Sequence, residues 1–268
     1  FYIKNLFSES LSGRKYIFEL YPFSFAEFLS AKEVSPPVRR ESPAESTHIY
    51  YTRYLDEYIR YGGFPGVVTE DSHEQKNKKL EDIFSSYWSL EVERLSDFRK
   101  KDNFRDFIFL LMERAGSRLD ASKLSRELGI VLPTVQAYIN FLRDTYMIAT
   151  VSPFSTNRDT EIRSAKKVYF TDTGLLRLYA GLPEGAIFEN KCYNILSQKY
   201  CVQYYQRKNG VEINFILDKS RALEAKLSAQ EQHIKSLART AAPIGISDYQ
   251  VVSKRYSSDP HVTFAYLL

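Results

Sequence analysis

Side chains that could hold a metal ion and act on a phosphate gather in the last third of the sequence. Glu212 and Asn214 alternate with apolar residues in one stretch, and Glu224 and Lys226 flank Ala225 in the next. Because side chains two residues apart on a strand point to the same face, two neighbouring strands are predicted to present carboxylates, an amide and a lysine together. Mg²⁺ prefers oxygen ligands, and a lysine beside it can steady a scissile phosphate or position the attacking water.

Glu189, on the helix predicted before these strands, would add a carboxylate from above them. We therefore predict a catalytic group of Glu189, Asn214, Glu224 and Lys226, with Glu189, Asn214 and Glu224 as ligands of Mg²⁺. Glu189 and Glu224 would hold the metal, and Lys226 would orient the water or the phosphate. Asn214 is a neutral ligand, so it lowers the expected affinity for the cation, and Glu212 on the same face could partly compensate.

The elements that must position this group read as an α/β arrangement. A helix is followed by three strands, a second helix and two closing strands, at residues 186–199, 202–206, 211–217, 222–227, 230–240, 249–253 and 262–267. Lys208-Asn209-Gly210 is predicted to turn the chain between the first two strands. The chain before residue 150 is mainly helical in pattern, so the fold class is mixed, with an α-helical region followed by an α/β domain.

Three short helices and a hairpin are predicted between residues 104 and 178. Asp120 is placed to cap the second helix and Gly129 to end it, and Pro133 suits the first turn of the third helix. The polar stretch within 150–170, before the alternating run Val168–Phe170, would form the wing of a winged helix-turn-helix.

The predicted winged helix offers groups that could contact DNA. The third helix carries groove-reading candidates at Thr134, Gln136, Tyr138 and Asn140. Phosphate contacts could come from the second helix and the wing, through Lys123, Arg126, Arg158, Arg163, Lys166 and Lys167. The third helix has no Lys or Arg before Arg143, so direct base readout is weak and a protein-docking role for this region stays open.

Composition leaves the partner open. The 268 residues are 44% hydrophobic and 26% charged, which is typical of a folded chain of about two domains. The net charge of +4 permits a nucleic-acid partner without requiring one. The two cysteines are too few for a zinc site or a disulfide framework, which fits a reducing, cytoplasmic compartment, and no apolar run approaches the ~20 residues of a membrane span. The four histidines stand alone in polar contexts and are expected at the surface.

Several ordered motifs carry a resemblance to known families. Glu189-Asn190, Glu212-Ile213-Asn214-Phe215 and Glu224-Ala225-Lys226 resemble the E…D…ExK signature of the PD-(D/E)xK nuclease superfamily. Four further segments are similar to a prokaryotic AAA+ ATPase family: Leu11-Ser12-Gly13-Arg14, Tyr21-Pro22-Phe23-Ser24-Phe25-Ala26-Glu27-Phe28-Leu29, Tyr61-Gly62-Gly63-Phe64-Pro65 and Lys167-Val168-Tyr169-Phe170-Thr171-Asp172-Thr173-Gly174-Leu175.

The resemblance implies a domain organisation. Members of that family carry a P-loop ATPase core, then a helical and winged-helix region, then a nuclease-like domain of uncharacterised function. This chain is similar to the C-terminal part, with a remnant edge of the ATPase core at 1–31, a helical segment at 32–103, a winged helix at 104–178 and a nuclease-like domain at 179–268. Arg14 stands where the resemblance places an arginine finger, which reaches the nucleotide of a neighbouring subunit.

Two departures from the family pattern shape the expected function. No Gly-x-x-x-x-Gly-Lys-Ser/Thr segment occurs, so ATP binding, ATP hydrolysis and subunit contacts are expected only with the missing core. Asn214 stands where the family has an aspartate, so the nuclease-like site is expected to be impaired. We expect the chain to engage DNA and no membrane. A working metal nuclease, a binding domain with weak catalysis, a structural remnant and a non-enzymatic protein-interaction or regulatory module stay as alternatives.

Overall fold

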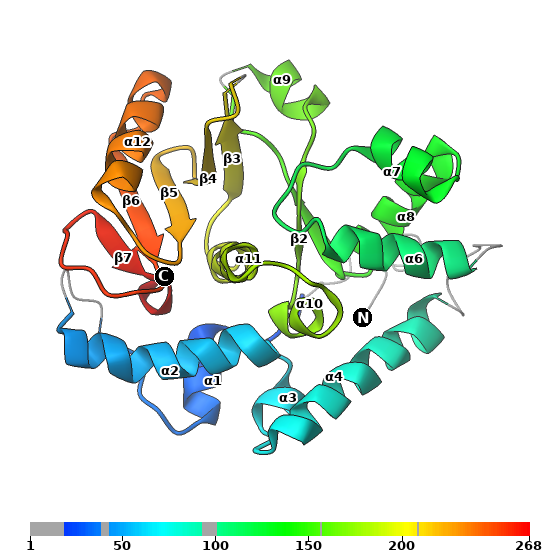
Figure 1. Ribbon diagram of the computed structural model, residues 1–268, viewed down its shortest axis with the longest axis horizontal. Helices are drawn as coiled ribbons and strands as arrows, with labels where there is room; N and C mark the ends of the chain where they lie inside the picture. The colour runs from blue at the N-terminus through cyan, green and yellow to red at the C-terminus, as the bar shows by residue number, and fades with distance from the viewer. Residues whose placement is uncertain (1–18, 39–42, 93–100, 156, 208) are drawn as a thin grey trace, which may run out of the picture.

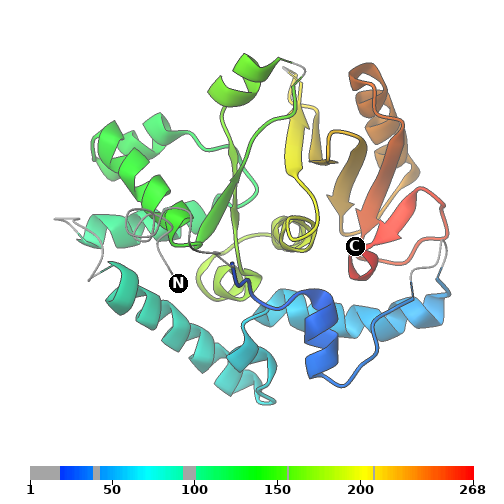
Figure 2. The same ribbon diagram turned by 180° about the vertical axis from the view of Figure 1, so that it is seen from behind.

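Two groups of elements flank a central strand in the computed structural model, which describes residues 19–38, 43–92, 101–155, 157–207 and 209–268. A five-stranded sheet lies on one side of β2 (Lys167–Phe170), and the helices α6 to α8 lie on the other (Figure 1). The view from behind shows the same division, with α1 (Phe25–Ala31) beside α2 (Glu45–Tyr61) at the bottom (Figure 2).

Polar residues cap α1 and α4 at their N-termini. Ser24 caps α1 in a capping box with Glu27, and Ser72 accepts a hydrogen bond from the Gln75 N–H at the start of α4 (His73–Tyr87). Between α2 and α4 lies the short α3 (Pro65–Val68), and the π-helix η1 (Trp88–Val92) follows α4. Gly62 ends α2 with a φ of 76°, in the left-handed region that favours glycine.

The three helices predicted after residue 100 are confirmed as α6 (Lys101–Met112), α7 (Ala121–Leu128) and α8 (Leu132–Asp144). Asp120 and Gly129 cap α7 as predicted, and Pro133 lies in the first turn of α8. The antiparallel pair of β1 (Ile148–Val151) and β2 follows, and α9 (Arg158–Arg163) lies in their connection. The connection is therefore partly helical.

The remaining elements confirm the predicted α/β order, except that the last predicted strand, 262–267, ends at Phe264 and continues as a 3-10 helix. They are α10 (Thr173–Tyr179), α11 (Glu184–Leu196), β3 (Val202–Gln206), β4 (Glu212–Leu217), β5 (Arg221–Lys226), α12 (Glu231–Ala241), η2 (Ala242–Ile244), β6 (Asp248–Ser253), β7 (Val262–Phe264) and η3 (Ala265–Leu267). The sheet has the order β3-β4-β5-β6-β7, antiparallel from β3 to β5 and parallel from β5 to β7. α11 packs on β5, and α12 packs on β4, β5 and β6.

A β-bulge interrupts β4 beside the predicted site. Gln203 pairs with Ile216 but Tyr205 pairs with Ile213, so β4 holds one residue more than β3 over this interval. A bulge breaks the strict alternation of side chains along a strand. Asn214 and Phe215 occupy the bulged interval, opposite Tyr204 of β3.

β2 lies between two hydrophobic cores. Tyr169 belongs to the core of the sheet, α11, α1 and α2, whereas Val168 and Phe170 belong to the core of α4, α6, α7, α8 and α10. Successive side chains of a strand face opposite sides, so a strand buried on both sides needs a continuous apolar run. Packing also cuts across the predicted boundary at residue 31, because α1 and α2 both join the core of the C-terminal sheet.

The surface prediction for the histidines is wrong for His48. Its side chain on α2 is buried and its ring lies 4.4 Å, centroid to centroid, from the ring of Phe264. Because α2 packs against η3, a residue in a polar stretch of sequence becomes part of a buried contact. No described helix is long and apolar enough to cross a membrane.

Candidate functional site

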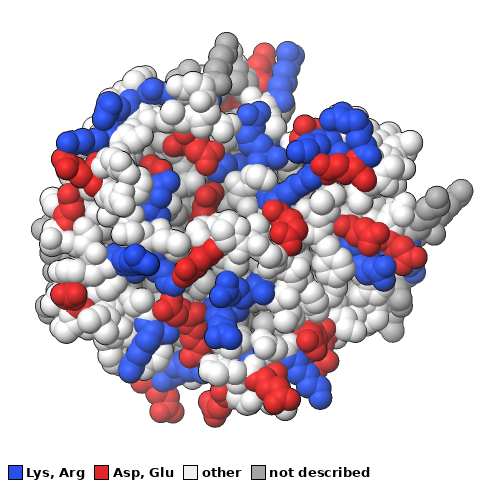
Figure 3. Space-filling view, in the orientation of Figure 1, with Lys and Arg blue, Asp and Glu red and all other residues white. Residues whose placement is uncertain are grey.

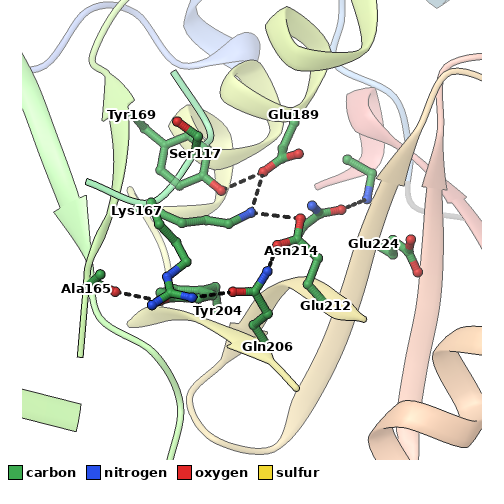
Figure 4. A network of polar contacts seen from close by, with 12 residues as sticks. Ser117, Ala165, Lys167, Tyr169, Glu189, Tyr204, Gln206, Glu212, Asn214 and Glu224 are labelled. Atoms are coloured by element: carbon green, nitrogen blue, oxygen red, sulfur yellow. Dashed lines mark hydrogen bonds and ion pairs between the residues drawn. The ribbon is translucent and has the colours of Figure 1, made fainter. Parts of the chain in front are cut away.

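A buried lysine joins two of the acidic side chains near the predicted site. Lys167 comes from β2, and only 2% of its side chain is exposed. Its ammonium nitrogen lies 3.2 Å from Glu189 Oε1 and 3.1 Å from Glu212 Oε1 (Figure 4). A helix and two strands of different sheets therefore meet at one cation.

Tyr169, two residues further along β2, completes this group. Its hydroxyl donates a 2.7 Å hydrogen bond to Glu189 Oε1, and its ring stacks on Tyr193. Burial, and next the charge of Glu189, raise the pKa of Tyr169 well above its usual value, so the phenol stays protonated and remains a donor. We call Lys167, Tyr169, Glu189 and Glu212 the Lys167 cluster.

Polar contacts connect the Lys167 cluster to the protein surface. Gln206 donates to Glu212 Oε2 at 3.4 Å and accepts a 2.9 Å hydrogen bond from the exposed Arg118. On the opposite side, Gly116 holds its loop close to Glu189, since a Cβ at this position would lie 3.5 Å from Glu189 Oε1. The cluster is thus shielded by a loop on one side and reaches solvent along the other.

The side chain of Asn214 has a structural role between two strands. Its side chain lies beside the Lys167 cluster (Figure 4), and its Oδ1 accepts a 2.9 Å hydrogen bond from the Ala225 N–H of β5. The residue is 5% exposed. The amide oxygen predicted to face a metal ion is therefore bonded to the neighbouring strand, where it satisfies a buried backbone donor.

The predicted residues Glu224 and Lys226 contact each other. Their side chains form an ion pair of 2.7 Å on β5. Figure 4 shows Glu224 apart from the network of dashed lines that joins Lys167, Glu189 and Glu212. The structure therefore brings Glu189 together with Lys167, Tyr169 and Glu212, and it places Glu224 in a separate pair with Lys226.

These residues do not fit a divalent metal in the observed arrangement. Among the described residues, no three His, Cys, Asp or Glu side chains gather to hold a metal ion. The Lys167 ammonium lies between Glu189 and Glu212, where it already neutralises negative charge that a cation would need. We therefore derive no chemical step through a metal at this site.

The candidate DNA-contacting residues divide by exposure. Gln136 and Asn140 are exposed one turn apart on α8, Thr134 is half-buried, and Lys123 and Arg126 on α7 are exposed. Arg163 is exposed and Lys166 half-buried in the β1–β2 connection. Arg158 lies in α9, and Arg14 lies outside the described residues.

Two predicted DNA contacts need correction. Lys167 is buried, and its charge is shared with Glu189 and Glu212, so it does not face solvent. Tyr138 is 2% exposed, with its ring against Phe104. The burial of both side chains results from packing around β2 and α8, which their local sequence does not reveal.

Asp172 joins two segments that are far apart in the sequence. Its carboxylate accepts hydrogen bonds of 2.7 Å from the Gly63 N–H and from the Gly174 N–H. The approach is close, because a Cβ at Gly62 would lie 2.0 Å from Asp172 Oδ1. Sequence reasoning singled out both segments as motifs but gave no sign that they touch.

Lys191 on α11 is a buried cation that sequence reasoning missed. Its ammonium lies 3.6 Å from the centre of the Tyr58 ring. Burial lowers the pKa of Lys191 to about 8, and the negative charge of Asp172 opposes this shift. Burial likewise raises the pKa of Asp172, against the opposing effects of Lys191 and of backbone N–H donors. The sequence around Lys191 predicts a helix but gives no sign that the lysine is buried.

The lowered pKa of Lys191 predicts that the free energy of unfolding rises with pH. Below pH 8 both folded and unfolded chains hold the proton, whereas between about 8 and 10.5 the unfolded chain holds more protons, so raising the pH favours the folded state. We expect Lys191 to add about 2 kcal/mol to the free energy of unfolding between pH 7 and about 9.5. Urea unfolding of the wild type and of Lys191→Met across this range measures the difference. Parallel curves for the two proteins would contradict the assignment.

Comparison with known proteins identifies a family and several relatives. Residues 52–185, half of the chain, match the family described as a domain of unknown function (DUF8612). An uncharacterised protein of Haemophilus influenzae is 26% identical over 219 residues, 78% of this chain and 52% of that protein. An uncharacterised protein of Methanocaldococcus jannaschii is 24% identical over 219 residues, 78% of this chain and 48% of that protein.

More distant matches cover less of the chain. An uncharacterised protein of Mycobacterium tuberculosis is 23% identical over 128 residues, 48% of this chain and 29% of that protein. No solved structure matches significantly. The chain spans about half the length of the first two relatives, and the family match ends before the five-stranded sheet begins.

Proposed function

The chain belongs to the DUF8612 family, a domain of unknown function, and we propose that it engages nucleic acid through α7, α8 and the β1–β2 connection without cleaving it. The observation that carries this proposal is the exposed polar face of α8. Gln136 lies on that face and lines a surface hollow of about 540 Å³, with Arg118 and Ala165 also in its wall. The exposed polar side of α8 thus borders a concave surface with a cation at its edge.

The arrangement of elements supports a winged-helix interpretation. α7 and α8 are joined by the short turn after Gly129, and the antiparallel β1 and β2 follow. In proteins with this layout the second helix of the pair enters the major groove and the connection between the strands contacts the flanking backbone. Lys123, Arg126 and Arg163 would then bind phosphates, and Gln136 and Asn140 would meet base edges.

The surface charge sets the expected strength of this contact. Basic and acidic side chains are interspersed on the face shown in Figure 3. On α7, Lys123 Nζ lies 4.0 Å from Glu127, which also pairs with Arg114. We therefore expect only three or four phosphate contacts and a moderate dependence of affinity on salt.

We propose that the α/β unit resembles a PD-(D/E)xK nuclease in order of elements but lacks metal-dependent cleavage. The support is chemical. Glu189 binds Lys167, Asn214 binds the Ala225 N–H, and Glu224 binds Lys226, so each predicted metal ligand already has a partner within the protein. The unit would then act as a binding or structural domain.

One titration tests binding and cleavage together. Fluorescence anisotropy with a labelled duplex between about 50 and 200 mM KCl should show affinity falling about 40- to 150-fold, as three to four released counterions require. The same samples with Mg²⁺ or Mn²⁺ should contain intact DNA, for the wild type and for Asn214→Asp.

Lys123→Ala should reduce the salt slope by about one. Lys235→Ala, an exposed lysine on α12, serves as the matched control.

A protein-interaction module is the second candidate. Val131 and Leu132 are 67% and 37% exposed at the start of α8, and Leu132 lines the same hollow as Gln136. Exposed apolar side chains in a concave surface favour a protein partner. Absence of duplex binding, or binding that does not change with salt, would favour this candidate over the first.

The proposed setting is the C-terminal part of an AAA+-type ATPase. The motif resemblance around the Gly62-Gly63 turn and Asp172 supports it, and the contact of Asp172 with Gly63 and Gly174 gives those motifs a common structural role. ATP binding and subunit contacts would belong to a P-loop core. ATP hydrolysis by the complete gene product, stimulated by the duplex DNA used above, would test this setting.

A further inference from the structure

A second polar cavity lies between α2, α8, β1 and α11. Its volume is about 260 Å³, and Tyr58, Arg143 and Lys191 are among its lining residues. No member of the Lys167 cluster lines it. The hollow beside Gln136 is also separate, since the two share no lining residue. This cavity is therefore a separate place on the protein from the residues proposed above to bind nucleic acid.

The Lys191 ammonium is the chemical centre of the cavity. Lys191 is 1% exposed, and its ammonium nitrogen lies over the face of the Tyr58 ring. The oxygens of the nearby Asp172 accept hydrogen bonds from backbone N–H groups. An ammonium has three donors, and a buried charge without hydrogen-bond acceptors is costly. A ligand that supplies acceptor oxygens would remove this cost.

Charged groups of both signs surround the cavity, and its two cations are the groups that could bind an acid. Three charged residues line the cavity, the cations Lys191 and Arg143 and the buried carboxylate Asp172. The Nε of Arg143 pairs with Asp144 at 3.3 Å, and a guanidinium has further N–H donors in the same plane. The Glu19 carboxylate accepts hydrogen bonds from the lining residues Tyr21 and Tyr146, so an acid group would have to bind at the donors of Lys191 and Arg143. Lys191 is buried, and the Arg143 side chain is 44% exposed.

The edge of a strand adds polar backbone groups. Ile148, Ala149 and Thr150 all line the cavity, which requires the main-chain edge of β1 to face it. β1 pairs with β2 along one edge, and just after β1 the chain bonds to Tyr204 of β3, so a ligand could reach only the main chain of β1 itself. A ligand with both acceptors and donors fits this edge.

Aromatic rings and small volume limit the shape of the ligand. Tyr21 and Tyr146 line the cavity and lie edge to face with centroids 6.5 Å apart. Tyrosine rings bind flat apolar groups well. Because the cavity is slightly smaller than a typical ligand pocket, it suits a molecule of about one ring with one acidic group.

We propose that this cavity binds a small planar organic acid, whose carboxylate or phosphate oxygens contact the Lys191 ammonium. The ring lies among the tyrosines, and Arg143 at the exposed side attracts the acid. The site is formed where α11 brings Lys191 against Tyr58 of α2 and faces β1.

Three probes of one size test the charge requirement. Benzoate and phenyl phosphate carry the two acidic groups, and benzamide has the shape of benzoate without its charge. Ligand-observed NMR on the whole chain should show binding of benzoate or phenyl phosphate at least tenfold tighter than that of benzamide, and the ratio of the two acids identifies the preferred anion. Equal binding of benzamide, or binding of none of the three, would overturn the proposal.

Two further measurements locate the binding. Lys191→Met should weaken acid binding at least tenfold, whereas Lys123→Met on α7 should leave it unchanged.

In the wild type, acetylation of Lys191 by acetic anhydride, followed by peptide mass analysis, should slow at least threefold when the preferred acid is present, relative to Lys123. This second measurement does not depend on how the variant folds. Unchanged acetylation of Lys191 under saturating acid would refute the assignment.

Discussion

Replacing Lys167 with methionine is expected to lower the free energy of unfolding by about 3 kcal/mol. The substitution keeps most of the side chain's volume but leaves Glu189 and Glu212 facing each other without the cation that lies between them. Removing one partner of a buried ion pair costs about 3–5 kcal/mol, and the partial exposure of Glu212 favours the lower end of that range. Urea unfolding measures the change.

A neighbouring lysine provides the control for this prediction. Lys166→Met alters the half-buried lysine that directly precedes Lys167, and it should change the free energy of unfolding by less than about 0.5 kcal/mol. Adding Glu189→Gln and Glu212→Gln to Lys167→Met should restore much of the loss, because the repelling charges are then gone. If Lys167→Met were as stable as the wild type, the Lys167 cluster would not be a coupled group.

The second large effect is expected for Gly174→Ala. A Cβ at this position would lie 2.5 Å from the Tyr61 carbonyl oxygen and 2.9 Å from Asp172 Oδ1, so backbone must move to admit it. We expect a loss of about 3 kcal/mol or more and a melting temperature about 6–12 °C lower. Circular dichroism during heating measures this change.

Gly185→Ala is the matched control because it adds the same methyl group where there is room. No atom lies within 4 Å of a Cβ built on Gly185, which is in the first turn of α11. Alanine is the better helix former, so stability should stay the same or rise by about 0.5 kcal/mol. Equal losses at Gly174 and Gly185 would show that the close approach of α10 to Tyr61 is not what selects glycine.

Local sequence patterns predicted many of the elements correctly. The caps Asp120 and Gly129 marked α7, and the order of helices and strands after residue 184 agrees with the alternating apolar pattern. These signals are local, since a cap or an alternation acts within a few residues of the chain. The β-bulge at β4 was missed because it depends on pairing with β3, which no residue of β4 reveals.

The candidate site was predicted only in part. Glu189 lies in a polar cluster as expected, but its partners are Lys167 and Tyr169, which had been assigned to a wing and to a strand. A lysine beside an apolar run can be exposed or buried. Only the carboxylates on α11 and β4 offset the free-energy cost of burying its charge. The same is true of Lys191, whose neighbour Tyr58 is 133 residues away in the chain.

The amino-acid sequence by itself determined the order of the main helices and strands after residue 100, the mixed fold class and the polar face of α8, because these follow from periodicity and caps. Tertiary structure alone decided that Asp172 ties the Gly63 turn to α10, that Lys167 lies between two carboxylates and that Lys191 faces a cavity. The physical reason is that the state of a charged group depends on what distant segments place within a few ångströms of it, through desolvation and Coulomb interaction.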